Sequence, residues 1–400
     1  MVICHIWDGD YPWDVRVEKI CESLAKKHIV HLVCRNSTRR LRYERAKDLH
    51  IHRLPFVSDG WGKLNDVIGF PAFCNPLWIY HIWRVVRFIK ADVIIVRDLP
   101  LALTAIGIGR LLCIPVILDM AENYPAMIRD LWDRDGFSVV NFLVRNPAII
   151  RFVERLSLEW CDHVLVVVEE SRDRLLSAGV PIHRISLVIN TPTCARWVDL
   201  PNLPDGLMVR DSNSLILVYL GLLEWPRGVE TTIRAMPLLR GHIPGARLII
   251  VGSGRHEGVF RKLVDELELQ SHVSFLGWLD YASAIRVIME SDIGLVPHYA
   301  TESWNTTVPN KLFDYMSMGK PVIVSNAKPT ERIVQQEQCG VVFQEKNAQD
   351  LVCAVFQLQD PTVRQRMGQN GKSAITRTYN WFVDEERLLR SVDFVLERKA

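Results

Sequence analysis

Short β-branched runs alternate with segments of helical length along the chain, and this alternation constrains the fold more than any other feature. Two intervening segments, Val15–Lys27 and Pro76–Lys90, carry apolar residues at three- and four-residue spacing, as helices that cover a sheet do. Strands alternating with helices predict a parallel α/β sheet. The strands expected in residues 1–200 are Val2–Ile6, Ile29–Cys34, Asp92–Val96, Val116–Asp119 and Val164–Val168.

The same rhythm begins again after a break. The segment Asp199–Asn213 concentrates Pro, Asp, Asn and Gly, which predicts a linker. A chain of 400 residues fits two domains of roughly 150 residues or more. We therefore predict domains at 1–200 and 201–380 with a cleft between them, and a C-terminal helix at 381–400 that is a candidate to pack back on the first domain. Strands are expected in the second domain at Leu215–Leu220, Arg247–Val251, Val273–Leu276, Ile293–Val296 and Val322–Ser325.

Composition excludes several classes of protein. Hydrophobic residues make up 48% of the chain, charged residues 24%, and the net charge is only +2, which indicates a folded globular protein without a nucleic-acid partner. The nine cysteines never fall at CxxC spacing, so we expect reduced thiols and no zinc site.

The location of the protein is also constrained. The opening strand Val2–Ile6 is followed by acidic residues and does not resemble a signal peptide. The longest apolar stretch, Leu99–Leu118, is interrupted by Arg110 and Pro115, so no membrane span is expected. These features predict a cytoplasmic protein.

A glycine loop follows the first strand of the second domain. The loop Gly221–Gly228 reads GLLEWPRG, in which Gly221 lets the backbone approach a ligand and Arg227 supplies a fixed cation. Such a loop suits a diphosphate. An ordinary glycine turn with a solvated arginine is the alternative.

A second junction carries a stronger signal. Thr306 and Thr307 precede Pro309, a residue favoured in the first turn of a helix, which predicts a helix from about Pro309 to Met318. Lys311 and the helix N-terminus could then face an anion, with Asn310 and Asp314 on roughly the same side. This arrangement predicts a nucleotide clamp, with phosphates at the helix tip and a ribose hydroxyl at Asp314. A capped surface helix is the alternative.

Neither a Rossmann dinucleotide fingerprint nor a Walker loop is present.

At these residues the chain resembles the retaining GT-B glycosyltransferases of family 4, the group 1 glycosyl transferases. GLLEWPRG resembles the family's GxxxxxKG loop, with Arg227 in the lysine position, and PNKLFDYMSMGKPVIVS resembles the end of its E-x7-E pattern, with Asp314 in the second acidic position. The resemblance implies an α/β GT-B fold, with two Rossmann-like parallel-sheet domains facing each other across a cleft. It also implies that Arg227 grips the donor diphosphate and that Asp314 holds the ribose. Two positions depart from the pattern: Thr306 stands where the first glutamate would be, and Leu222 stands where many members have an arginine.

Further donor residues follow from the same resemblance. VGSGRHEGVFRKLVDEL, VSFLGW and SDIGLVPH occur in the family's order. They imply that Gly252 lies in a donor-side loop, that the backbone near Gly277 and Trp278 touches the nucleobase, and that His298 lies near the donor sugar. Taken separately, each could be only a buried strand and its turn.

The acceptor side is expected in the first domain. Asp14 and Arg16 lie in a loop that resembles the family's PxDxRv form, although Asp14 could simply cap a helix. Asp119 and Glu122 follow a strand, where the family often has a histidine or an acid near the reacting sugar. Glu122 is the candidate for an acceptor-side catalytic group, and a structural role is the alternative.

Two segments of the acceptor half suggest contact with an anionic membrane surface and a lipid-linked acceptor. One is the apolar segment Phe137–Phe152, and the other is a basic cluster comprising Arg35, Arg39, Arg40, Arg42 and Arg45. The alternative is that the basic cluster is a solvated loop and the apolar segment a core helix.

Together these features predict a metal-independent glycosyltransferase of polysaccharide or glycoconjugate biosynthesis. Its substrates would be a nucleotide-diphosphate sugar and a saccharide or lipid-linked acceptor, without a further cofactor. Arg227, Lys311 and the amides near Thr306 and Thr307 would stabilise the departing diphosphate. A GT-B-like sugar-nucleotide epimerase and a non-catalytic sugar-nucleotide or polysaccharide-binding protein remain as alternatives.

Overall fold

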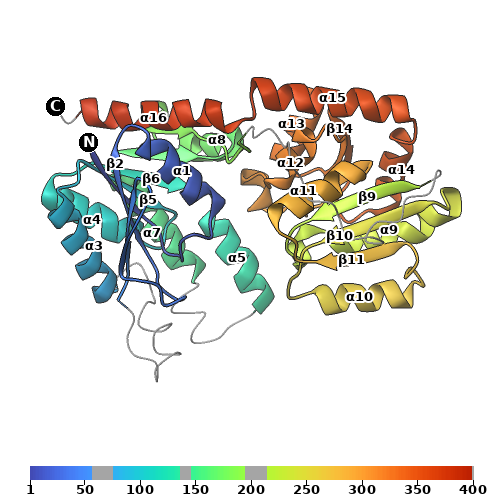
Figure 1. The fold of residues 1–400 in the computed structure, drawn as a ribbon, viewed down its shortest axis with the longest axis horizontal. Coiled ribbons are helices and arrows are strands. Elements are labelled where there is room, and N and C mark those ends of the chain that lie inside the picture. Colours follow the sequence, from blue (N-terminus) through green and yellow to red (C-terminus); the bar gives the residue numbers. More distant parts are fainter. Residues whose placement is uncertain (56–74, 136–145, 194–213, 399–400) are drawn as a thin grey trace. The chain divides into compact units, whose positions relative to one another are not determined.

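The computed structural model describes residues 1–55, 75–135, 146–193 and 214–398. The chain forms two compact units, one from Met1–Asn190 together with Asp384–Ala400 and the other from Thr191–Val383 (Figure 1). The predicted linker Asp199–Asn213 and the predicted boundary at residue 200 lie outside the described residues. The last helix, α16 (Trp381–Glu397), contributes most of its length to the first unit.

The first unit contains one eight-stranded sheet in the order β3-β4-β2-β1-β5-β6-β7-β8. Its strand pairs are parallel except β3–β4, which is antiparallel. The sequence predicted five of these strands within two residues at each end but did not predict β3, β4 or β8. The strands are β1 (Val2–Ile6), β2 (Ile29–Cys34), β3 (Tyr43–Ala46), β4 (Leu49–Arg53), β5 (Val93–Arg97), β6 (Val116–Met120), β7 (His163–Val166) and β8 (Ile185–Leu187).

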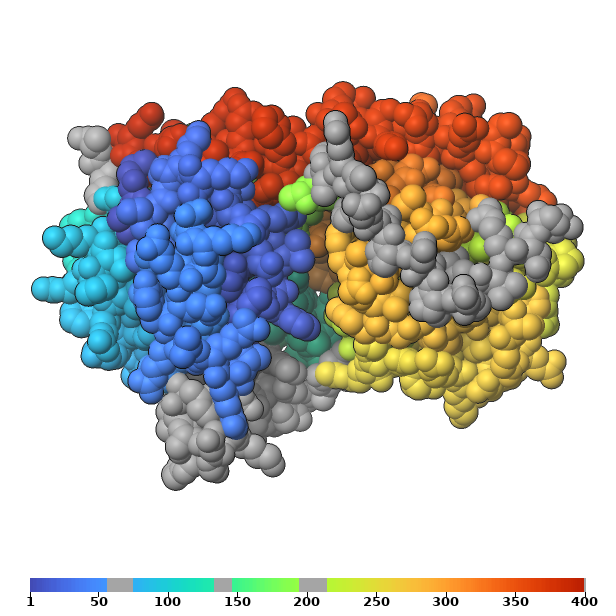
Figure 2. Space-filling model, viewed as in Figure 1, coloured from blue at the N-terminus to red at the C-terminus, as the bar shows by residue number. Residues whose placement is uncertain are grey.

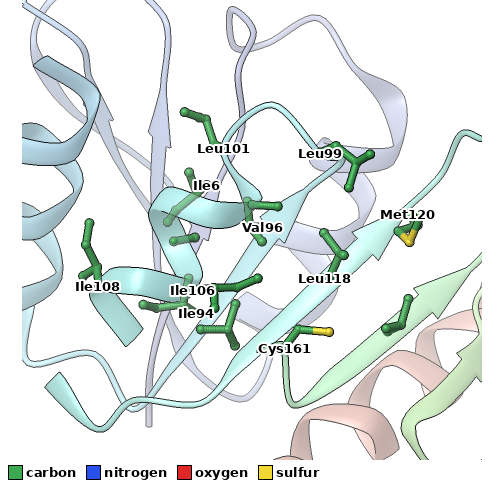
Figure 3. Packing of buried hydrophobic residues seen from close by; sticks show 14 of the residues in the cluster. Ile6, Ile94, Val96, Leu99, Leu101, Ile106, Ile108, Leu118, Met120 and Cys161 are labelled. Atoms are coloured by element: carbon green, nitrogen blue, oxygen red, sulfur yellow. The ribbon is translucent and has the colours of Figure 1, made fainter. Parts of the chain in front are cut away.

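Helices cover this sheet, and the two predicted helices are confirmed. Alternate strand residues such as Ile94, Val96 and Leu118 pack beneath Ile106 and Ile108 of α4, as Figure 3 shows. This packing gives the first unit its own apolar core. The helices are α1 (Val15–Ala25), α3 (Pro76–Ile89), α4 (Ala102–Leu112), α5 (Tyr124–Asp135), α7 (Pro147–Trp160), α8 (Glu169–Ser177) and α16.

The second unit contains a six-stranded parallel sheet in the order β11-β10-β9-β12-β13-β14. The five strands predicted here are confirmed within a residue, and β14 is an addition. The strands are β9 (Leu215–Leu220), β10 (Ala246–Val251), β11 (Val273–Gly277), β12 (Ile293–Val296), β13 (Val322–Ser325) and β14 (Gly340–Phe343). The helices are α9 (Val229–His242), α10 (Glu257–Glu266), α11 (Tyr281–Glu290), α12 (Lys311–Ser317), α13 (Lys328–Glu337), α14 (Ala348–Gln357) and α15 (Pro361–Arg377).

Each sheet reverses its strand order at one point. In the second unit the reversal falls between β9 and β12, and in the first unit it falls between β1 and β5. In open parallel sheets, ligands bind outside the carboxyl ends of the strands at this switch point. Ligand-binding residues are therefore expected in the loops that follow β9 and β12 and in those that follow β1 and β5.

Candidate functional site

The loop after β9 lies at the switch point of the second sheet and is held there by glycines. Gly228 has φ 71°, and a Cβ at this position would lie 1.7 Å from the carbonyl oxygen of Pro297, which follows β12. Gly252, after β10, has φ 128°, and its Cβ would lie 2.0 Å from the Gly221 carbonyl oxygen. Glycine is required at both places because any side chain would separate these loops.

Two cations converge beside Gly221. A Cβ at Gly221 would lie 3.0 Å from the Lys311 Nζ atom and 3.7 Å from the Arg227 Nη1 atom. Lys311 begins α12, whereas Arg227 ends the short 3-10 helix Trp225–Arg227 in the loop after β9. The structure therefore brings together the two residues that the sequence predicted for a diphosphate.

The Lys311 ammonium is buried and has no hydrogen-bond partner. The residue is 5% exposed, and its Nζ atom lies 3.8 Å from the centre of the Tyr219 ring. Burial lowers the pKa of Lys311 well below its usual value, the charge of Arg227 lowers it further, and Asp314 opposes the shift. A buried cation beside a second cation is unfavourable unless an anion joins them.

Tyr315 fixes the position of α12 against the sheet. Its hydroxyl group accepts a hydrogen bond from the Leu220 N–H group at 2.9 Å, and it contacts the Val218 carbonyl oxygen at 3.3 Å. Its ring covers Gly294 of β12, where a Cβ would lie 2.3 Å from the ring. These contacts tie α12 to both strands of the switch point, so Lys311 cannot swing into solvent without disturbing the core.

An aromatic and imidazole pair completes the site. His298, after β12, is 1% exposed, and neither ring nitrogen has a hydrogen-bond partner. Its ring centre lies 4.2 Å from that of Trp304, and the Arg227 guanidinium lies 5.4 Å from the Trp304 ring centre. Burial lowers the pKa of His298, and Lys311 and Arg227 lower it further. His298 is therefore a neutral imidazole with hydrogen-bonding capacity left for a ligand.

Asp314 lies in the same helix as Lys311. It is 8% exposed, and it accepts a hydrogen bond from the Tyr281 hydroxyl group at 3.0 Å. Tyr281 comes from the start of α11, so Asp314 is oriented by a second element.

The start of the helix differs from the prediction. The helix begins at Lys311 instead of Pro309, and Asn310 makes no side-chain capping bond. The Thr306 hydroxyl group donates within its own turn, to the Glu302 and Ser303 carbonyl oxygens at 3.0 and 3.1 Å. This threonine therefore does not cap α12.

The amides of this first turn are also engaged. Those of Leu312, Phe313 and Asp314 are bonded to the preceding turn. Thr307 is extended and lies three residues before Asn310. The first turn therefore differs from the prediction in its detail, because these three amides are bonded within the turn and the positive groups beside Gly221 are the side chains of Lys311 and Arg227. A phosphate site at this end of α12 stays a prediction.

The remaining predicted donor residues lie at the end of β11. Gly277 has φ 68°, and its carbonyl oxygen accepts a hydrogen bond from the Gly252 N–H group at 2.7 Å. The following Trp278 is 64% exposed. β11 is separated from β9 by one strand, so these residues lie along the same carboxyl edge as the cations.

In the first unit, Arg16 and Asp119 form a buried ion pair at 2.6 Å and are 1% and 0% exposed. The Arg16 Nη1 atom also donates to the Val188 carbonyl oxygen at 2.8 Å. Burial alone would raise the pKa of Asp119, but Arg16 holds it below its usual value. Because both side chains are enclosed and paired with each other, the prediction that they touch an acceptor is corrected to a supporting role.

Asp14 and Glu122 remain accessible near this pair. Asp14 caps α1, accepting hydrogen bonds from the Arg16 and Val17 N–H groups, and also lies 3.3 Å from the Arg97 guanidinium. Glu122 is exposed, and its charge acts on Arg97. Asp14 therefore does act as the helix cap that was the alternative interpretation, and its second oxygen joins the cluster at the switch point.

Arg97 and Asp98 are site residues that the sequence analysis missed. Arg97 contacts Asp14, Asp98 and Asp119 at 3.3, 3.1 and 3.4 Å. Asp98 has φ 54°, and burial raises its pKa to about 7 although Arg97 opposes the shift. The signal in the sequence was their position, because this charged pair directly follows the apolar run VIIV of β5, the strand beside β1.

The predicted membrane segments are only partly described. Arg35 pairs with Asp8 at 2.6 Å, whereas Arg39, Arg40, Arg42 and Arg45 are exposed. Of Phe137–Phe152, residues 137–145 lie outside the described part of the chain, and the remainder enters α7. Among the described residues, no helix is both long enough and apolar enough to cross a membrane.

The described ranges contain no group of three or more His, Cys, Asp or Glu side chains arranged to hold a metal ion. The seven cysteines within them are free, and Cys74 and Cys194 lie outside them. Metal independence stays a prediction.

Comparison with solved structures defines the class of protein. Sucrose-phosphate synthase from Thermosynechococcus elongatus superposes with a TM-score of 0.75 at 18% identity and covers 100% of both chains. HepE of Anabaena in complex with UDP gives a TM-score of 0.70 at 12% identity and covers 98% of this chain and 100% of the other. The chain has the GT-B fold of two doubly wound α/β domains.

Sequence comparison then gives the family. Residues 14–191 match the glycosyl transferase 4-like domain, and residues 209–374 match the glycosyl transferases group 1 model. The chain belongs to the group 1 glycosyl transferases. Glycogen synthase of Mycobacterium tuberculosis is 22% identical over 299 residues, which are 73% of this chain and 66% of that protein.

Replacing Lys311 by methionine should stabilise the ligand-free protein. Methionine fills a similar volume without a buried charge, so we expect a gain of about 1 kcal/mol or more, which corresponds to a rise in Tm of about 2–4 °C for a domain of this size. Thermal unfolding followed by calorimetry measures the change. A lower Tm for the variant would show that the ammonium is a structural group with a partner.

Asp98→Asn should change the pH dependence of stability. The pKa of Asp98 is about 7 in the folded protein and near 3.8 when unfolded, so the fold binds the extra proton and loses stability as pH rises between these values. Asparagine keeps the acceptor for the Ala121 N–H group and tolerates positive φ. Urea unfolding should show the variant gaining up to about 2–3 kcal/mol over the native protein between pH 5 and pH 8. An equal difference at both pH values would contradict the raised pKa.

Proposed function

We propose that this protein transfers a sugar from a nucleoside-diphosphate sugar to a saccharide or lipid-linked acceptor in polysaccharide or glycoconjugate biosynthesis. One observation carries the proposal: the buried Lys311 ammonium has no hydrogen-bond partner and lies beside Arg227 at the switch point of the second sheet. The diphosphate of a sugar donor would supply the negative charge that neutralises these two cations. The UDP complex of HepE, a protein of the same fold, supports a nucleotide donor.

The chemistry follows from where charge develops. When the bond between the sugar and the diphosphate breaks, negative charge grows on the leaving phosphate while the sugar becomes oxocarbenium-like. Cations already fixed in place stabilise that charge without rearranging during the reaction. Arg227 is held by its contact with the Trp304 ring and Lys311 by its place in α12, so both meet this requirement.

The other donor contacts are assigned by position. Asp314, oriented by Tyr281, binds the ribose hydroxyl groups, and the backbone near Gly277 and Trp278 lies against the base. His298 offers its ring nitrogens to the donor sugar or its phosphate. Gly221 and Gly252 allow the phosphates to approach the backbone.

The acceptor binds on the side of the first unit. Asp14 and Glu122 are the accessible carboxylates of this cluster. The buried ion pair of Arg16 and Asp119 supports the cluster from the interior of the unit. Asp98 adds a carboxyl group whose pKa of about 7 suits proton exchange near neutral pH. Retention of the anomeric configuration follows from family membership. Contact with an anionic membrane surface would serve a lipid-linked acceptor.

Arg227→Ala and Asp314→Ala should each lower donor turnover by about 100-fold or more, since each removes a group that acts on the reacting nucleotide. Turnover is measured as release of nucleoside diphosphate from a panel of UDP and GDP sugars. Arg366→Ala on the exposed surface of α15 is the matched control and should behave as the native protein. Native rates in both site variants would refute the assignment, and binding of donor without any transfer or hydrolysis would favour a non-catalytic role.

A further inference from the structure

Three helices form a continuous layer over one face of the first sheet. α3, α4 and α7 pack side by side in that order, and their inner residues, such as Ile82, Ile106 and Val153, belong to one core cluster. Figure 2 shows the light-blue and cyan residues of α3 and α4 at the surface of the first unit. We call the outward side of these helices the α3–α4–α7 surface.

This surface is unusually apolar for a side that faces solvent. Phe88, Leu111 and Phe152 are 81%, 72% and 61% exposed, and Tyr80 is 57% exposed. The outer face of a helix that covers a sheet normally carries polar residues. Large apolar side chains grouped on neighbouring helices indicate an interaction surface.

The charged residues of the same surface are nearly all basic. Within the three helices the acids are Glu154, which is buried and paired with Arg174 at 2.9 Å, and the exposed Glu159. The exposed basic residues, including Lys90 directly after α3, are Arg84, Arg87, Lys90, Arg110, Arg151 and Arg155. The surface therefore complements a partner that is anionic and has an apolar interior.

Two arginines lie against aromatic rings of this surface. The Arg87 guanidinium lies 5.7 Å from the centre of the Trp83 ring, and that of Arg110 lies 4.9 Å from the centre of the Trp160 ring. Tryptophan and tyrosine favour the boundary between water and hydrocarbon, and arginine stems lie along apolar groups while the charge reaches phosphates.

We infer that the α3–α4–α7 surface binds the headgroup region of an anionic lipid bilayer. Phe88, Leu111 and Phe152 enter the boundary between headgroups and acyl chains, while the arginines contact lipid phosphates. A second copy of the chain fits less well, because a twofold arrangement would set arginines against arginines. The inference does not depend on the donor site, which lies in the other unit.

The test uses the full chain with vesicles of phosphatidylglycerol and phosphatidylcholine in equal parts, and with vesicles of phosphatidylcholine alone. Co-sedimentation should show binding to the anionic vesicles only. Arg84→Gln with Arg151→Gln should weaken the partition coefficient about 25-fold, at about fivefold for each arginine. Phe88→Gln with Phe152→Gln should weaken it tenfold or more.

A matched control removes the same charge from another helix. The control variant combines Arg366→Gln with Lys372→Gln, two residues of α15, a helix that contains no acid and presents no large exposed apolar side chain. This variant should bind the anionic vesicles as the native protein does. Native Tm values and a native thermal shift with UDP or GDP establish that each variant is folded and has an intact donor site.

Three results would overturn the inference. They are the absence of binding to anionic vesicles, equal loss of binding in the control variant, and a dimer in sedimentation velocity that the phenylalanine substitutions convert to monomer. Loss of donor turnover with vesicle binding intact would instead count against the proposed function alone.

Discussion

The whole arrangement of the second unit depends on one unfavourable placement: the Lys311 ammonium is enclosed by protein, bonded to nothing, and close to a second cation. Its contact with the Tyr219 ring lessens the cost of burial without neutralising the charge. A fold tolerates such a group when a ligand supplies the missing charge, and the binding energy then reflects the relief of that cost. The pyrophosphate link of a nucleotide sugar is an anion of the required charge, and its departure is the event that the same cations would assist.

The surrounding structure keeps the two cations from separating. The glycines at 221, 228 and 252 let the loops after β9, β10 and β12 touch one another, so Arg227 is drawn toward the end of β9. Tyr315 bonds to that same strand and holds α12, and with it Lys311, from the other side. A comparable cluster at the switch point of the first sheet joins Asp14, Arg97 and Asp98. In both units, backbone constraints and buried contacts place charge at the carboxyl ends of the strands.

The alternation of apolar strands and helices was sufficient to predict most of the two sheets, because strands buried on both faces read as continuous apolar runs. β3 was missed because its residues Tyr43–Ala46 are polar and partly exposed at the sheet edge. β4 was missed because its buried Leu49 and Ile51 alternate with histidines and form no continuous apolar run. Loop spacing predicted Arg227, Lys311 and Asp314 but not how they meet, since burial and ring contacts such as Trp304 depend on residues distant in sequence. The start of α12 was misplaced because Pro309 has the φ of a first helical turn without entering the helix, and the Arg16–Asp119 pair could not be foreseen from residues 103 positions apart.

Proton uptake on donor binding tests the central claim most directly, because burial lowers the pKa of Lys311 and a bound diphosphate would raise it again. Titration calorimetry of a nucleoside-diphosphate sugar, in two buffers of different ionisation enthalpy, counts the protons exchanged. Arginine at this position keeps its proton at any accessible pH, so the Lys311→Arg variant is the reference. The account predicts net uptake by the native protein, increasing as the pH rises through the lowered pKa of Lys311, and none by the variant. Donor binding with the same proton count in both proteins would contradict it.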